Sequence, residues 1–151
     1  MTAEWIGPYG GVPAFDKVAT ADFVPALTAA MKADTAEINA IANTRAKPTF
    51  DNTIAALERS GGMLDRVDTF YGIGSGTLST PEMRAIEKEM SPKLSAHSDE
   101  TLQNAKLFAR IEAVYNDRAK LTPEQQRLTW VYWNRFVRAG AKLSPADKAR
   151  V

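Results

Sequence analysis

Apolar residues recur every three to four positions through five long segments of this chain, and no segment shows a sustained alternation of apolar and polar residues. A spacing of three to four places apolar side chains on one face of a helix, whereas a half-buried strand needs a spacing of two. The sequence therefore predicts an all-α fold, a helical bundle of about five helices.

Length and composition fit an ordinary globular domain. A chain of 151 residues suits one domain, and 44% hydrophobic with 25% charged residues is a normal balance. The net charge of +1 comes from 19 basic and 18 acidic residues spread along the chain, so neither nucleic acid nor a membrane surface is indicated as a partner. Cysteine is absent, which excludes disulfides and thiolate chemistry.

No apolar run approaches the length of a transmembrane helix, and the first residues form neither a basic nor an apolar segment of an export signal. The location, cytoplasmic or periplasmic, stays open on these grounds.

The first 19 residues differ from the rest of the chain. Gly7-Pro8, Gly10-Gly11 and Pro13 break regular structure, while Trp5 and Phe15 are among several apolar anchors. We expect residues 1–19 to form an extended leader packed on the helices, and residues 20–151 to form the helical domain.

The first two helices are expected over residues 20–43 and 51–72. The pair Gly61-Gly62 lies inside the second, but the apolar positions keep the same helical phase on both sides of it. We therefore predict one continuous helix there, in which the glycines allow a neighbour to approach closely. Residues 72–77 are glycine-rich, but a helix precedes them and no Lys-Ser or Lys-Thr pair follows directly, so they predict a loop and not a phosphate site.

The remaining helices have clear start signals. Two helices begin with a capping threonine, a proline and an acidic residue in order, at Thr80-Pro81-Glu82 and at Thr122-Pro123-Glu124. At the second start, Gln125 completes a capping box. Another helix follows Asn104. Pro92 lies inside the third helix and predicts a kink over residues 88–92.

The last helix signal stands at the end of the sequence. In Leu143–Val151, Ser144 is a suitable cap and Pro145 fits the first helical position. So short a helix is unstable alone, so we expect the start of a sixth helix and an N-terminal piece of a longer protein.

Few residues suggest chemistry. His97 is the only histidine and lies on the apolar stripe of the third helix, so it is interpreted as a packed structural residue. A zinc site needs three or four ligands, which a set with one histidine and no cysteine does not readily supply. The acidic pairs Asp65 and Asp68, and Glu87 and Glu89, are interpreted as solvated faces with basic neighbours.

An aromatic cluster lies in the fifth helix. Tyr132 and Phe136 share a face that should meet the core, whereas Trp130 and Trp133 point elsewhere. We expect the two tryptophans to belong to an interface that the rest of a longer protein would cover.

Four stretches of the sequence resemble the opening region of bacterial peptidyl-dipeptidases, also called dipeptidyl carboxypeptidases, of the thimet oligopeptidase-like zinc metallopeptidase family. The resemblance runs over nearly the whole chain in the right order. It is carried by Gly10–Val18 with Asp22–Leu27, by Pro48–Gly61, by Ile86–His97 and by Arg135–Leu143.

The resemblance implies a parent hydrolase that removes dipeptides from the C-termini of short oligopeptides by zinc-dependent proteolysis. Family members carry an H-E-x-x-H motif with two zinc-binding histidines and a water-activating glutamate, and this sequence lacks the motif. We therefore expect no catalytic, cofactor-binding or metal-binding residue in this chain. The resemblance also implies that the region forms part of the wall of a deep substrate channel.

The partners implied are the missing catalytic domain of the same chain and, in the parent, an oligopeptide substrate. Self-association of the isolated piece is a further hypothesis, since surfaces meant for the missing part would be exposed. The alternative function is a stand-alone helical interaction module that shares the ancestry but has no peptidase activity.

Overall fold

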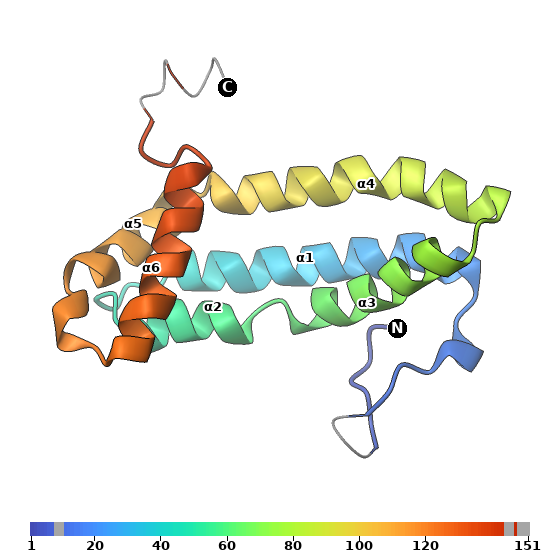
Figure 1. Cartoon of the computed structure of the whole chain (residues 1–151), viewed down its shortest axis with the longest axis horizontal. Coiled ribbons are helices and arrows are strands. Elements are labelled where there is room, and N and C mark those ends of the chain that lie inside the picture. The colour runs from blue at the N-terminus through green and yellow to red at the C-terminus, as the bar shows by residue number, and fades with distance from the viewer. Residues whose placement is uncertain (8–10, 144–146, 148–151) are drawn as a thin grey trace. The chain divides into compact units, whose positions relative to one another are not determined.

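The structure is a computed structural model that describes residues 1–7, 11–143 and 147 (Figure 1). The all-α prediction is confirmed, because these residues contain helices and no strand. No helix in this part of the chain has the length and apolarity needed to cross a bilayer. The predicted start of a sixth helix falls on residues 144–151, which lie outside the described residues apart from Asp147. The α-helices are α1 (Phe23–Ala42), α2 (Ala55–Arg59), α3 (Gly62–Thr77), α4 (Pro81–Leu102), α5 (Ala105–Asn116) and α6 (Pro123–Arg138).

Shorter helical turns connect these elements. A π-helical turn, Phe50–Ile54, leads directly into α2. The 3-10 turns are Phe15–Lys17, Thr20–Asp22 and Arg118–Lys120.

The chain divides into two compact units, each with its own hydrophobic core. Unit 1 consists of Met1–Glu37 and Gly61–His97, and unit 2 consists of Ile38–Ser60 and Ser98–Val151. The core of unit 1 is built by the apolar stripes of α1, α3 and α4, as their helical spacing predicts. Its buried residues are Phe23, Leu27, Ala30, Val67, Phe70, Tyr71, Met83, Ile86 and Met90.

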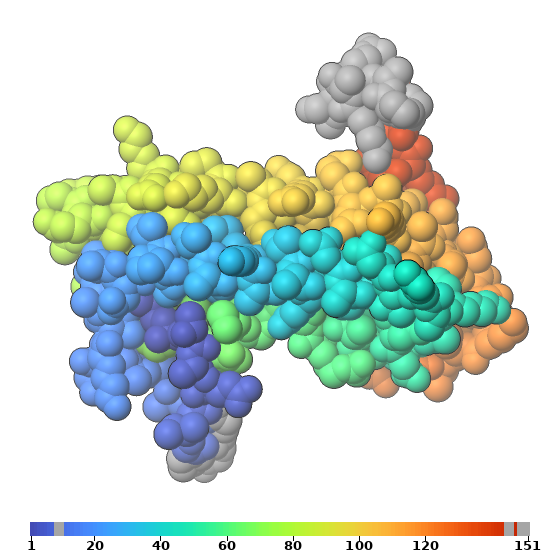
Figure 2. Space-filling view, turned by 180° about the vertical axis from the view of Figure 1, so that it is seen from behind, coloured from blue at the N-terminus to red at the C-terminus, as the bar shows by residue number. Residues whose placement is uncertain are grey.

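Aromatic residues of the leader pack against unit 1. The rings of Trp5 and Phe15 both meet the ring of Phe70 edge-on, at centroid distances of 6.1 and 5.1 Å. The blue atoms of this segment lie beside the green atoms of α3 in Figure 2. Edge-to-face pairs of this kind add to the apolar burial, so the leader contributes to the core of this unit.

The prediction of one helix over residues 51–72 is wrong, because the helix is interrupted at Ser60-Gly61. Gly61 has a φ of +78°, a left-handed conformation that a residue with a Cβ rarely adopts. Its backbone N–H donates a 2.7 Å hydrogen bond to a carboxylate oxygen of Glu37. This bond to α1 satisfies an amide at the start of α3, and the sequence pattern alone does not reveal it.

The predicted loop over residues 72–77 is also wrong, because α3 continues to Thr77. Gly74 is buried there, and a Cβ added to it would lie 2.9 Å from the Phe23 ring. The glycine thus permits close packing between α3 and α1, and this packing outweighs the low helix propensity of the glycine-rich sequence.

The predicted helix starts are confirmed. The Thr80 hydroxyl accepts a hydrogen bond from the Met83 amide, and the Asn104 side chain accepts one from the Leu107 amide. The capping box at the start of α6 is present in both directions. Helix α4 runs through Pro92 without interruption, and the kink over residues 88–92 stays a prediction.

The core of unit 2 lies between α5, α6 and the turn that leads into α2. The α5 stripe is buried as predicted, and the ring of Phe108 stacks on that of Phe136 with a centroid distance of 6.1 Å. Val131, an apolar residue of α6, is 41% exposed. The buried members are Ile38, Ile41, Ala42, Ile54, Leu57, Leu107, Phe108, Ile111, Val114 and Phe136.

Candidate functional site

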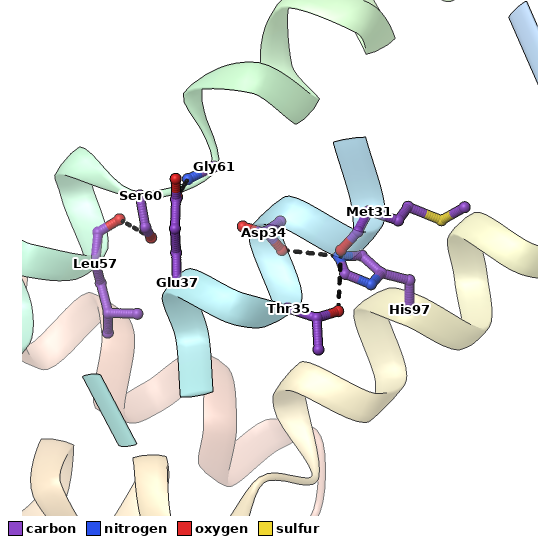
Figure 3. Close-up of polar contacts among 8 residues, drawn as sticks. All are labelled: Met31, Asp34, Thr35, Glu37, Leu57, Ser60, Gly61 and His97. Atoms are coloured by element: carbon purple, nitrogen blue, oxygen red, sulfur yellow. Dashed lines mark hydrogen bonds and ion pairs between the residues drawn. The ribbon is translucent and has the colours of Figure 1, made fainter. Parts of the chain in front are cut away.

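His97 pairs with a carboxylate that the sequence analysis did not connect to it. Its Nε2 lies 2.7 Å from an Oδ of Asp34, so the pair joins α4 to α1 inside unit 1 (Figure 3). The two side chains are only 11% and 12% exposed. A hydrogen-bonded pair that is so little exposed holds two helices at a defined position.

Polar side chains of α1 on either side of the pair make hydrogen bonds within unit 1. The nearby Thr35 hydroxyl donates to the Met31 carbonyl one turn back in α1, as Figure 3 shows. The Glu37 carboxylate, one turn further along α1, accepts from the Gly61 amide. No group of three or more histidine, cysteine or acidic side chains suited to a metal ion occurs within the described residues.

We expect the His97–Asp34 pair to contribute to stability as a coupled unit. In a double-mutant cycle with His97→Gln and Asp34→Asn, the coupling free energy should be about 1 kcal/mol. Each single variant already breaks the same largely buried hydrogen bond, so the double variant should lose less stability than the sum of the two single losses. Urea unfolding of the four proteins measures it.

The matched control is the exposed ion pair of Glu89 with Lys93 on the same helix, whose charged atoms lie 2.7 Å apart. Its coupling should stay below about 0.5 kcal/mol because both side chains are about half exposed. Equal coupling in the two pairs would contradict a special structural role for His97.

The acidic pairs proposed from the sequence lie on solvated faces. Asp65, Asp68 and Glu89 are exposed, and Glu87 is half-buried. The ion pair between Glu89 and Lys93 matches the predicted pairing with basic neighbours. Three of these four carboxylates are therefore solvated, as on an ordinary charged helix face.

Two of the α6 aromatic residues face the core of unit 2, as expected. Phe136 is 3% exposed, and Tyr132 packs against the same cluster while its hydroxyl donates to Glu58 at 2.6 Å. The Trp133 ring stacks on Tyr115 with a centroid distance of 4.2 Å and an interplanar angle of 6°. Trp133 therefore packs largely inside unit 2. This differs from the expectation that it belongs to an interface with the rest of a longer protein.

Trp130 remains at the surface. It is 36% exposed, and its ring is covered on one side by the Arg127 guanidinium, with 4.4 Å between the guanidinium carbon and the ring centroid. Of the two tryptophans expected to lie at an interface, this one retains free apolar surface.

Arg110 is an unusual polar residue that the sequence reasoning missed. It is only 6% exposed, and it donates to the carbonyls of Thr44 and Ala46 and to the side chains of Asn52 and Thr53. The two carbonyls follow the C-terminal end of α1, where a positive charge is favoured. The arginine thus ties the α1–α2 connection to α5, which is a structural role.

The chain is similar in sequence to two known bacterial proteins. It is 38% identical over 141 residues to a dipeptidyl carboxypeptidase of Escherichia coli and 37% identical over 141 residues to a dipeptidyl carboxypeptidase of Salmonella typhimurium. Each match covers 92% of this chain and 21% of the relative. No family model matches the chain.

The chain therefore spans about a fifth of the length of the curated relatives it matches. The similarity extends over 92% of the chain, in agreement with the four stretches recognised in its sequence. The resemblance of this chain to a region of the bacterial peptidyl-dipeptidases is thereby confirmed.

Proposed function

We propose that the chain is the N-terminal, non-catalytic portion of a zinc metallopeptidase that releases C-terminal dipeptides from short oligopeptides. The observation that carries this proposal is the 38% identity over 92% of the chain to a dipeptidyl carboxypeptidase nearly five times as long as the matched region. The chemistry is assigned to the part of such a protein that this chain does not include.

The residues of this chain do not fit the zinc ion that such an activity requires. An H-E-x-x-H site needs two histidines one helical turn apart, and His97 is the only histidine of the sequence. His97 is also engaged by Asp34 in the packing of α4 on α1. We therefore assign zinc, water activation and peptide-bond cleavage to the remainder of the parent protein.

The role proposed for the helices is to form part of the wall of the substrate channel. Unit 1 and unit 2 each have a closed apolar core with specific polar ties, as a rigid wall requires. A rigid wall would restrict access to extended, unstructured peptides and would exclude folded proteins.

The isolated chain should have no peptidase activity. Purified protein, stripped with a chelator and then restored with zinc, is expected to release no dipeptide from an oligopeptide with a free C-terminus. The reason is that the sequence has a single histidine and no cysteine, and that no group of side chains suited to a metal ion occurs in the described part of the chain. Chromatographic detection of the released dipeptide measures this, with the Escherichia coli relative as the positive control.

A His97→Ala variant separates real activity from contamination. If the chain releases dipeptide and the variant does not, the non-catalytic assignment is wrong. If both release it equally, His97 takes no part in the cleavage, and release that separates from the chain on size-exclusion chromatography identifies a contaminating peptidase.

The second candidate function is a stand-alone interaction module. The two compact cores favour it, because a unit with its own core can fold without a catalytic domain. Reading the gene beyond Val151 distinguishes the two functions. A continued reading frame with an H-E-x-x-H motif supports the peptidase, and a stop codon directly after Val151 supports the module.

A further inference from the structure

One face of α6 combines exposed apolar and cationic side chains. Figure 1 shows α6 in front of α5. Trp130 and Val131 are 36% and 41% exposed, which are high values for large apolar residues on a helix that also contributes to a core. We call this face the α6 outer stripe, and its members are Arg127, Trp130, Val131, Asn134, Arg135 and Arg138.

Helical geometry places these six residues together. Positions separated by three, four or seven residues lie on one side of a helix, and the stripe runs through residues 127, 131, 134 and 138, with Trp130 and Arg135 beside it. Phe136 and Thr129, on the opposite side, are 3% and 0% exposed. Burial therefore agrees with the geometry.

The stripe is positively charged. Its three arginines are exposed, and none of them takes part in the ion pairs found between described residues, which involve Lys93, His97, Lys120 and Lys142. Arg135 and Arg138 lie in the last turn of α6, where the helix dipole favours cations. The helix dipole does not explain Arg127, which lies at the N-terminal end of the stripe, or the exposed Trp130 and Val131.

The composition of the stripe is that of a protein interface. Tryptophan and arginine are enriched at interfaces, whereas lysine and acidic residues are depleted. The exposed side of α4 offers the contrast, because Glu82, Lys88, Glu89 and Lys93 mix both charges as an ordinary solvated face does. Between Arg127 and Arg138 the α6 outer stripe contains no lysine and no carboxylate, and the exposed Glu124 lies on the same side one turn earlier, in the first turn of α6.

We propose that the α6 outer stripe is the surface on which the remainder of a longer peptidase chain packs, through a patch of that remainder that carries carboxylates around an apolar centre. This inference rests on the proposed function. The relatives have about four fifths of their length outside the matched region, so a large neighbouring body is available to cover the stripe. Carboxylates would complement the three arginines, and an apolar group would cover Trp130 and Val131.

A second copy of this chain is a less suitable occupant. A two-fold symmetric contact through the stripe would place arginines of one copy against arginines of the other. Such like-charge contact opposes association, so the occupant must be a surface of opposite charge.

The test compares the 151-residue chain with the full-length protein produced from its continued reading frame. Arginine modification with phenylglyoxal, read by mass spectrometry, should be at least about tenfold slower at Arg127, Arg135 and Arg138 in the longer protein. Arg45 is the matched control because it is exposed in unit 2 and lies outside the stripe, so its modification rate should not change.

A triple variant tests the contact energetically. Arg127→Glu, Arg135→Glu and Arg138→Glu together should make the longer protein markedly more sensitive to proteolysis after α6. The same variant of the 151-residue chain should keep its helical circular dichroism, because the three side chains are exposed. Charge reversal at the exposed Arg45 of the longer protein is the control and should change neither property.

The outcomes separate the inference from the proposed function. An active longer peptidase in which the three arginines react as fast as in the isolated chain would overturn the inference and leave the proposed function standing. Dimerisation of the isolated chain that the triple variant abolishes would overturn it in favour of a second copy. If the three arginines are protected from phenylglyoxal in a longer protein that has no peptidase activity, the contact is supported and the proposed function is wrong. A stop codon directly after Val151 would overturn both.

Discussion

Arg110→Ala is expected to lower the free energy of unfolding by about 3 to 4 kcal/mol. The guanidinium donates four hydrogen bonds of 2.7 to 3.3 Å, two to backbone carbonyls and two to side chains, from a position that is 6% exposed. Alanine would leave these acceptors without a donor and would leave a cavity beside α5. Urea unfolding followed by circular dichroism measures the loss.

Two further variants show whether the geometry or the charge of Arg110 is responsible for the stability that it contributes. Arg110→Lys keeps the charge but not the planar set of donors, so it should recover only part of the lost stability. Arg45→Ala, at an exposed position of the same unit, should change stability by less than about 0.5 kcal/mol. A loss at Arg110→Ala as small as that at Arg45→Ala would contradict the role assigned to the buried arginine.

Local signals of the sequence predicted the helix starts well. The caps at Thr80, Asn104 and Thr122 act on amides three residues away, so a short stretch of sequence contains both partners of each hydrogen bond. The apolar stripes also predicted most of both cores, because burial follows helical spacing.

Long-range contacts account for what the sequence did not predict. The break at Gly61 depends on the Glu37 carboxylate 24 positions earlier, and the His97 partner, Asp34, lies 63 positions away. The acceptors of Arg110 lie 57 to 66 positions before it. Helical phase could not reveal the break, because the apolar positions on both sides of Gly61 keep the same spacing.

The exposed residues of α6 illustrate the same limit for the candidate site. The sequence pattern treated Trp130 and Trp133 alike, as two residues that point away from the core. The stacking of Trp133 on Tyr115 depends on how α5 and α6 pack, so only the structure separates the tryptophan that packs within the unit from the one that remains at the surface.

Gly74→Val is expected to lower the free energy of unfolding by about 1 to 3 kcal/mol. Gly74 is buried in α3, and a Cβ at this position would lie 2.9 Å from Cζ and 3.4 Å from a second carbon of the Phe23 ring. Phe23 is itself only 4% exposed, so its ring cannot move aside without disturbing the core of unit 1. Thermal unfolding of the isolated chain measures the effect.

Gly72→Val is the matched control, because it makes the same substitution two residues earlier in the same helix. Gly72 is exposed and a Cβ there would meet nothing within 4 Å, so the better helix propensity of valine should leave stability unchanged or raise it by up to about 0.5 kcal/mol. A loss of stability at Gly74→Val without a loss at Gly72→Val is therefore the expected result. If both variants are stabilised, α3 does not pack closely on Phe23, and the reason given for a glycine-rich helix in place of the predicted loop is wrong.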